Sequence, residues 1–123
     1  MVLIDTSIWI DHLRTGDSIV TGLLLDGRAL VHPWIIGELA LGTSRDRAAM
    51  LRDLCKLDAA IVATDAELFR FIEDHGLSGT GVGYIDAGLL ASTKLTPDAS
   101  LMTRDKRLRS VAERLGVSAR LTH

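Results

Sequence analysis

Apolar positions along the chain follow two spacings that alternate from the N-terminus to the C-terminus. Short unbroken apolar runs are typical of strands buried on both faces of a sheet, and five such runs predict strands at residues 2–4, 29–31, 59–63, 100–103 and 119–122. Apolar residues spaced three or four apart predict helices between them. A first helix is capped by residues 5–7 and ended by Gly16. Further helices are predicted at residues 18–25, 33–41, 45–57, 64–75, 84–95 and 106–115.

Capping and turn residues support these boundaries. Thr64 and Glu67 have the spacing of a capping box, Pro33 suits the first turn of a helix, and Gly116 suits a helix end. Residues 78–83 contain three glycines and are predicted to form a flexible loop. No glycine-lysine phosphate motif follows that loop, so it is interpreted as a rim rather than a phosphate-binding element.

The alternation of strands and helices predicts the fold class. Strands separated by single helices imply right-handed crossovers, and therefore an α/β fold with a mainly parallel sheet of four to five strands. Helices on both faces would make a three-layer α/β/α sandwich. A chain of 123 residues suits one hydrophobic core, so residues 1–123 are expected to form a single domain.

Composition says more about the cellular location of the protein than about its chemistry. The single cysteine, Cys55, cannot form an internal disulfide, and no export signal or apolar stretch of membrane-spanning length is present, so a cytoplasmic protein without a membrane partner is expected. The formal net charge of −2 lacks the basic signature of many nucleic-acid binders. The segment from Lys94 onward is nevertheless basic, with seven Lys or Arg residues against three Asp or Glu residues.

Four acidic residues have surroundings that set them apart from the other acids. Asp5 and Asp105 each follow a short apolar run, and open α/β sheets bind ligands at the carboxyl ends of their strands. Glu38 and Asp86 each lie within an apolar segment, where burial of an unpaired carboxylate is costly. Individually, Asp5 and Asp105 also fit simple helix caps, Glu38 a residue at the rim of the core, and Asp86 a carboxylate favoured by a helix dipole.

Together the four carboxylates indicate a metal site. Converging carboxylates repel one another unless a divalent cation with oxygen ligands, Mg²⁺ or Mn²⁺, lies between them. The hydroxyls of Thr6, Ser7 and Thr103 are predicted to orient the carboxylates. Zinc is disfavoured because the four histidines lack zinc-motif spacing and only one cysteine is present. A phosphate-receiver domain is disfavoured because His32 and Pro33 occupy the position of its acceptor aspartate.

With these residues in view, the chain resembles the PIN-domain family and, within it, the VapC toxins of bacterial toxin–antitoxin pairs. The resemblance spans the whole chain, and its order and spacing are more specific than any one piece. It is carried by four segments, VLIDTS at 2–7, ELALG at 38–42, YID with LLA at 84–91, and TRDKRL at 103–108.

The resemblance implies a magnesium-dependent endoribonuclease that hydrolyses RNA phosphodiester bonds. It maps the acidic set onto Asp5, Glu38, Asp86 and Asp105, with Asp5, Asp86 and Asp105 as the direct metal ligands and Glu38 binding the metal or positioning its water. Conserved hydroxyl positions fall on Thr6 and Thr103. Basic residues on the C-terminal side would hold the RNA backbone, and these are Arg104, Lys106, Arg107 and Arg109.

The resemblance also implies partners. A cognate antitoxin is expected to lie across the protein and block the site, and the first two predicted helices offer a groove for it. Its apolar candidates are Trp9, Leu13, Ile19, Leu23 and Leu24, which could equally be ordinary core. A homodimer is expected by analogy. Two alternatives stay open, a PIN nuclease of RNA processing outside a toxin pair and a catalytically inactive PIN-like domain that binds proteins.

Overall fold

Four short strands form one sheet at the centre of the molecule. The structure, a computed structural model, describes residues 1–120. The strands are β1 (Val2–Ile4), β2 (Ala29–Val31), β3 (Asp58–Ala59) and β4 (Ser100–Met102). The helices are α1 (Thr6–Thr15), α2 (Ser18–Leu25), α3 (Pro33–Ala40), α4 (Arg47–Leu54), α5 (Asp65–Asp74), α6 (Tyr84–Leu95) and α7 (Lys106–Arg114).

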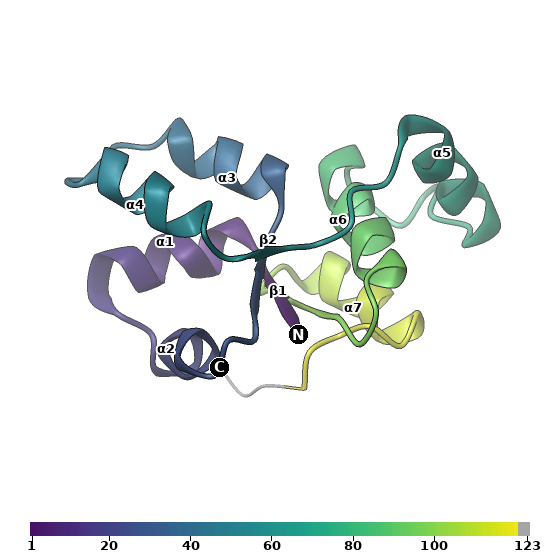
Figure 1. The fold of residues 1–123 in the computed structure, drawn as a ribbon. Coiled ribbons are helices and arrows are strands. Elements are labelled where there is room, and N and C mark those ends of the chain that lie inside the picture. The colour runs from purple at the N-terminus through teal and green to yellow at the C-terminus, as the bar shows by residue number, and fades with distance from the viewer. Residues whose placement is uncertain (121–123) are drawn as a thin grey trace.

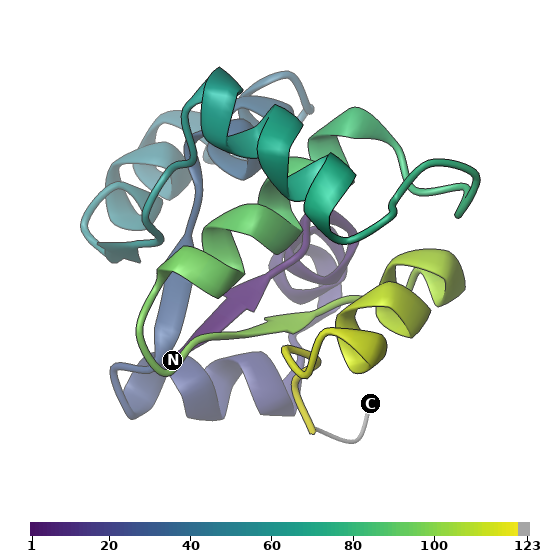
Figure 2. The same cartoon turned by 90° about the vertical axis from the view of Figure 1, so that its right-hand side faces the viewer.

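The sheet is parallel throughout, with the strand order β3-β2-β1-β4. Helices α1 to α4 lie on one side of the strands in Figure 1, and α5 to α7 lie on the other. Figure 2 shows β1 and β4 side by side and pointing the same way, with α6 packed across them. The expected α/β fold with helices on both faces of a parallel sheet is therefore confirmed.

The core follows the apolar runs of the sequence. All three residues of β1 and of β2 are buried, because each strand has neighbours on both edges and helices on both faces. Helix α6 buries seven consecutive residues, from Ala87 to Thr93, so it is a central element rather than a surface helix. Within residues 1–120, no helix is both long and apolar enough to cross a bilayer.

Three predicted elements differ from the structure. The strand predicted at residues 59–63 is only β3, Asp58–Ala59, because the chain leaves the sheet and the Ile61 N–H donates to Thr96 Oγ1 instead of a strand. The helix predicted at residues 45–57 is the shorter α4. Of the strand predicted at residues 119–122, residues 119–120 form no strand, although the Ala119 N–H donates to the Leu101 carbonyl and an isolated bridge joins Leu101 to the preceding Ser118; residues 121–122 lie outside the described residues.

Helices α3 and α6 make an unusually close contact. A Cβ atom on Gly88 of α6 would lie 2.2 Å from Cζ3 of the Trp34 ring on α3. Real carbon atoms that are not bonded do not approach so closely, so only glycine fits opposite this ring as it stands. The contact joins the start of α3 to the middle of α6.

Candidate active site

The candidate site lies where the direction of strand addition reverses. Strand β1 has β2 on one side and β4 on the other, so the chain builds the sheet outward in both directions from β1. Crevices at the carboxyl ends of strands at such a point bind the ligands of open α/β folds. Asp5 directly follows β1, and Thr103 directly follows β4. The predicted residues at the two strand ends are therefore neighbours.

Asp5 is held by hydrogen bonds to both of its carboxylate oxygens. Oδ1 accepts from the backbone N–H of Thr6 at 2.8 Å, which caps α1, and Oδ2 accepts from the Thr103 hydroxyl at 2.7 Å. Thr103 is only 5% exposed, so its hydroxyl is a fixed donor rather than a mobile surface group. The cap and the site position, which the sequence presented as alternatives, thus coexist in Asp5.

Asp105, in the loop that follows β4, is hydrogen-bonded to the same threonine. Its backbone N–H donates to Thr103 Oγ1 at 3.1 Å, and its Oδ1 accepts from the Leu108 N–H at 2.9 Å, which caps α7. One buried hydroxyl therefore links the loop that bears Asp105 to the carboxylate of Asp5. The predicted orienting role of Thr103 agrees with this geometry.

Glu38 reaches the site from the second turn of α3. Its Oε1 accepts from the Thr6 hydroxyl at 2.9 Å, so Thr6 contacts Asp5 with its backbone and Glu38 with its side chain. Although Glu38 lies within an apolar segment of the sequence, its side chain is exposed while its neighbour Leu39 is buried, as for a residue at the rim of the core. Adjacent residues on a helix point about 100° apart, so an apolar segment does not bury every member.

Asp86, in the first turn of α6, is electrostatically coupled to the other three acids. Its pKa is raised from an ordinary 3.8 to about 6, first by burial and then by the charges of Asp5, Asp105 and Glu38. The ion pairs found within residues 1–120 involve other acids, namely Asp11, Asp17, Asp53 and Asp74. The four predicted acids thus share one electrostatic environment that no lysine or arginine ion pair neutralises.

The donor set suits a hard divalent cation. All four groups are carboxylates, and their mutual repulsion is the kind that Mg²⁺ or Mn²⁺ relieves. Within residues 1–120, no three His, Cys, Asp or Glu side chains already have the arrangement of a metal site. Glu38 and Asp105 are exposed, so their side chains can rotate toward a cation without repacking the core.

Two basic residues near the site make contacts within the protein that the sequence did not reveal. Arg104 forms ion pairs with Asp11 on α1 and, at 3.6 Å, with Asp17 at the cap of α2. Arg109 donates through Nη2 at 2.7 Å and through Nε at 3.2 Å to the Thr103 carbonyl. Arg104 therefore joins two helices to the β4–α7 loop, and Arg109 holds the strand end in place.

Three other residues predicted for the site, Lys106, Arg107 and Ser7, have exposed side chains. Lys106 and Arg107 are exposed in the first turn of α7, beside Asp105. Arg107 also lies against the glycine-rich loop, where a Cβ on Gly81 would come within 2.8 Å of its Cδ. Ser7 is exposed in the first turn of α1, and among the described residues no hydrogen bond joins its side chain to the four acids. Its predicted orienting role is not reflected in the geometry.

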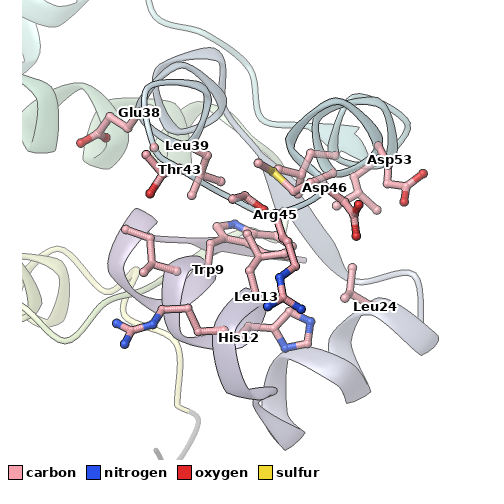
Figure 3. Close-up of a pocket in the computed structure, with 18 residues that line it drawn as sticks. Trp9, His12, Leu13, Leu24, Glu38, Leu39, Thr43, Arg45, Asp46 and Asp53 are labelled. Carbon is pink, nitrogen blue, oxygen red and sulfur yellow. The ribbon is translucent and has the colours of Figure 1, made fainter.

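A groove with a volume of about 1120 Å³ lies between α1 and α2 on one side and α3 and α4 on the other. Trp9, Leu13 and Leu24 line it, and Glu38 stands at one end (Figure 3). Of the other apolar candidates, Leu23 is core and Ile19 packs beside the core.

Trp9 gives this groove a polar feature. The Trp9 side chain is 1% exposed, and its Nε1 is a buried donor without a hydrogen-bond partner among residues 1–120. An unpaired buried N–H costs free energy, and an acceptor brought by a molecule in the groove would remove that cost. Nε1 has essentially no surface open to the groove in this structure, so an acceptor in the groove would reach it only after the side chains that cover it move.

Comparison with known proteins adds a sequence match over nearly the whole chain. The family model described as the PIN domain matches residues 2–114. Two curated relatives, both named Ribonuclease VapC32, come from two strains of Mycobacterium tuberculosis. Each is 43% identical to this chain over 118 residues. Each match covers 96% of this chain and 95% of the relative.

A solved structure matches the fold. The crystal structure of PAE2754 from Pyrobaculum aerophilum superposes with a TM-score of 0.52 at 18% identity. The superposition covers 93% of this chain and 90% of that one. At this identity the likeness bears on the arrangement of strands and helices alone, and it agrees with the parallel sheet described above.

Proposed function

The chain belongs to the PIN-domain family, and from that premise we propose that it is a magnesium-dependent endoribonuclease of the VapC type, the toxin of a toxin–antitoxin pair. One observation carries the proposal. The half-buried Asp86 has its pKa raised to about 6 by burial and by three converging carboxylates, which are the residues that the sequence singled out. Uncompensated carboxylates at a strand-end crevice are favourable only where a cation binds.

In this proposal Asp5, Asp86 and Asp105 hold the metal directly, and Glu38 binds it or positions its water. A bound Mg²⁺ or Mn²⁺ would supply an acidified water for attack on a phosphodiester and would neutralise charge on the phosphate. The Thr103 and Thr6 hydroxyls restrain the Asp5 and Glu38 carboxylates, because each already donates to one of their oxygens. The restraint on Asp5 comes from a buried hydroxyl, whereas the exposed Glu38 side chain can still rotate toward a cation.

The RNA backbone would lie along the start of α7. Lys106 and Arg107 are exposed next to Asp105, and we propose that they contact phosphates without reading sequence. Arg104 and Arg109 were predicted for the same role, but each already has protein partners. We propose that these two act by shaping the β4–α7 loop that presents Asp105.

Removing the metal tests the proposed activity. Purified protein stripped with EDTA is expected to leave total RNA intact, and added Mg²⁺ or Mn²⁺ is expected to restore cleavage, because the carboxylates alone cannot activate water. The measurement is the disappearance of full-length RNA on a denaturing gel. Cleavage that persists in EDTA would contradict the metal mechanism. Intact RNA at every metal concentration would favour the inactive, protein-binding alternative.

We propose that the cognate antitoxin occupies the groove between α1, α2, α3 and α4. The apolar lining suits an amphipathic segment, and the buried Trp9 N–H would suit an acceptor on that segment once the side chains that cover it move. Because Glu38 forms one end of the groove, a chain that fills it would end beside the acidic cluster. Blocking the site then requires no separate binding surface.

Trp9→Phe tests this assignment because it removes the N–H and keeps an aromatic ring. We expect the dissociation constant of the purified cognate antitoxin to rise about five-fold, the cost of one hydrogen bond of about 1 kcal/mol. Biolayer interferometry measures it, with Trp34→Phe as the matched control outside the groove. Equal affinities for Trp9→Phe and the unmodified protein would show that the antitoxin brings no acceptor to the Trp9 N–H.

The homodimer stays a prediction. Exposed apolar side chains gather where α5 and α6 contact each other, at Phe69, Tyr84 and Ile85, and this is the face that we propose for a second copy. Light scattering coupled to size-exclusion chromatography gives the mass in solution.

A further inference from the structure

A buried polar pair, His32 and Ser92, joins α3 to α6 at a distance from the acidic cluster. The His32 side chain is 1% exposed and Ser92 is fully buried, and His32 Nε2 lies 3.1 Å from Ser92 Oγ. His32 precedes α3 as its cap, and Ser92 lies in the second half of α6. Their sequence separation of 60 residues makes this a tertiary contact rather than a local one.

The hydrogen bonds of His32 fix its protonation state. The backbone N–H of Trp34 donates to Nδ1 at 3.0 Å, and an N–H can only donate, so Nδ1 carries no proton. The neutral ring must then carry its proton on Nε2, which donates to Ser92 Oγ. Burial lowers the pKa of His32, which agrees with a neutral ring at physiological pH.

Both helices in this contact carry residues of the acidic cluster. Glu38 lies six residues after His32, and Asp86 lies six residues before Ser92, which along a helix is about 9 Å in each case. The close contact of Trp34 with Gly88 lies on the same pair of helices. A directional hydrogen bond and a steric contact together leave α3 little freedom to slide or turn against α6.

We propose that the His32–Ser92 hydrogen bond is a positioning element that sets the spacing between Glu38 and Asp86, and through it the affinity of the site for its metal. This inference rests on the proposed function. A buried hydrogen bond adds little to stability over its apolar replacement, so its main effect here is direction rather than strength. Neither His32 nor Ser92 is proposed to contact the metal or RNA.

Ser92→Ala tests the proposal because it removes the hydroxyl and little else. The matched control is Thr93→Val, since Thr93 is equally buried in α6 but its hydroxyl donates to Leu89 O within the same helix. Mn²⁺ alone is titrated into each metal-free protein by calorimetry, without RNA. We expect Ser92→Ala to bind Mn²⁺ about 3- to 10-fold more weakly, less than the roughly 10- to 100-fold cost of losing a direct partner of a metal ligand. Thr93→Val is expected to bind Mn²⁺ as the unmodified protein does.

His32→Asn provides a second, independent variant. Asparagine can accept the Trp34 N–H as a helix cap but is too short to reach Ser92, so α3 keeps its start and loses its link to α6. We expect the same loss of Mn²⁺ affinity as in Ser92→Ala. The double variant should show no further loss, because both changes remove one interaction.

A readout without metal separates the two proposals. In the metal-free protein, the amide NMR signals of Glu38 and Asp86 are expected to move in Ser92→Ala and to stay in place in Thr93→Val. Unmoved signals, or an equal loss of Mn²⁺ affinity in both variants, would overturn the positioning role. A third outcome is that the signals move as expected but the unmodified protein binds no Mn²⁺. That outcome would support the positioning of the helices and overturn the metal premise of the proposed function.

Discussion

Asp86→Asn is expected to abolish metal-dependent RNA cleavage and, at the same time, to make the metal-free protein more stable at neutral pH. Asp86 is half-buried, and its charge is disfavoured first by burial and then by the charges of the other three acids. Loss of one ligand charge should lower cleavage at least about 100-fold, the upper end of what losing an outer-shell partner costs a metal site. Initial rates at saturating Mg²⁺ measure the effect.

The stability gain follows from the direction of the pKa shift. The folded-state pKa of Asp86 is raised to about 6 from an ordinary 3.8, so folding favours the protonated form. Its stabilising contribution is therefore present below pH 3.8 and is lost as the pH rises through about 6. At pH 7 the ionised group lowers the free energy of unfolding, by about 1 kcal/mol after allowance for its partial exposure to solvent. Asparagine carries no charge and should recover that amount.

Urea unfolding in EDTA at pH 7 and at pH 3.5 checks this prediction, because the gain should vanish at the lower pH. Asp65→Asn is the matched control, since Asp65 lies in the first turn of α5 as Asp86 lies in the first turn of α6. Without neighbouring acids of the cluster, it should lose up to about 1 kcal/mol of favourable dipole interaction and no activity. A destabilised Asp86→Asn variant at pH 7 would mean that the four acids do not repel one another.

Gly88→Ala is expected to destabilise the fold by about 1 to 3 kcal/mol, the usual cost of forcing an extra carbon into a packed core. The new Cβ would meet the Trp34 ring at 2.2 Å, so either the ring or the helix has to move. The Trp34 ring also lies tilted against the His32 and Tyr84 rings, with ring centroids 5.2 and 6.2 Å apart, which restricts its escape. Thermal or urea unfolding of the purified variant measures the loss.

Gly37→Ala separates this steric effect from the general effect of removing glycine from a helix. Gly37 lies within α3, and a Cβ there would meet nothing within 4 Å. Alanine at an exposed helical position usually adds about 0.5 to 1 kcal/mol to stability. The two substitutions should therefore have opposite signs. A stable Gly88→Ala protein would show that α3 and α6 have room to separate.

Strand and helix order could be predicted from apolar spacing because most strands here are buried on both faces. Residues 2–4 and 29–31 read as unbroken apolar runs and form β1 and β2 with those bounds. The same logic failed at residues 59–63, where Ile61 and Val62 are apolar but 49% and 45% exposed. A short apolar run does not reveal whether its backbone finds a neighbouring strand.

The acidic cluster could be anticipated because strand-end position and apolar context are both readable from the sequence. The sequence did not show which side chains pair when they lie far apart along the chain. Arg104 looked like a phosphate ligand, yet its partner Asp11 is 93 residues away. The capping role of His32 had a weak signal, since it directly precedes Pro33 in the first turn of a helix, but its link to Ser92 had none.

Glu38 belongs both to the acidic cluster and to the end of the apolar groove. Any molecule that fills the groove and changes the position or charge of Glu38 therefore changes the affinity of the cluster for a cation. Thermodynamic linkage makes that coupling reciprocal, so the cation must change the affinity of the groove by the same factor. The cellular supply of magnesium would then help to set how tightly the protein is held by its inhibitor.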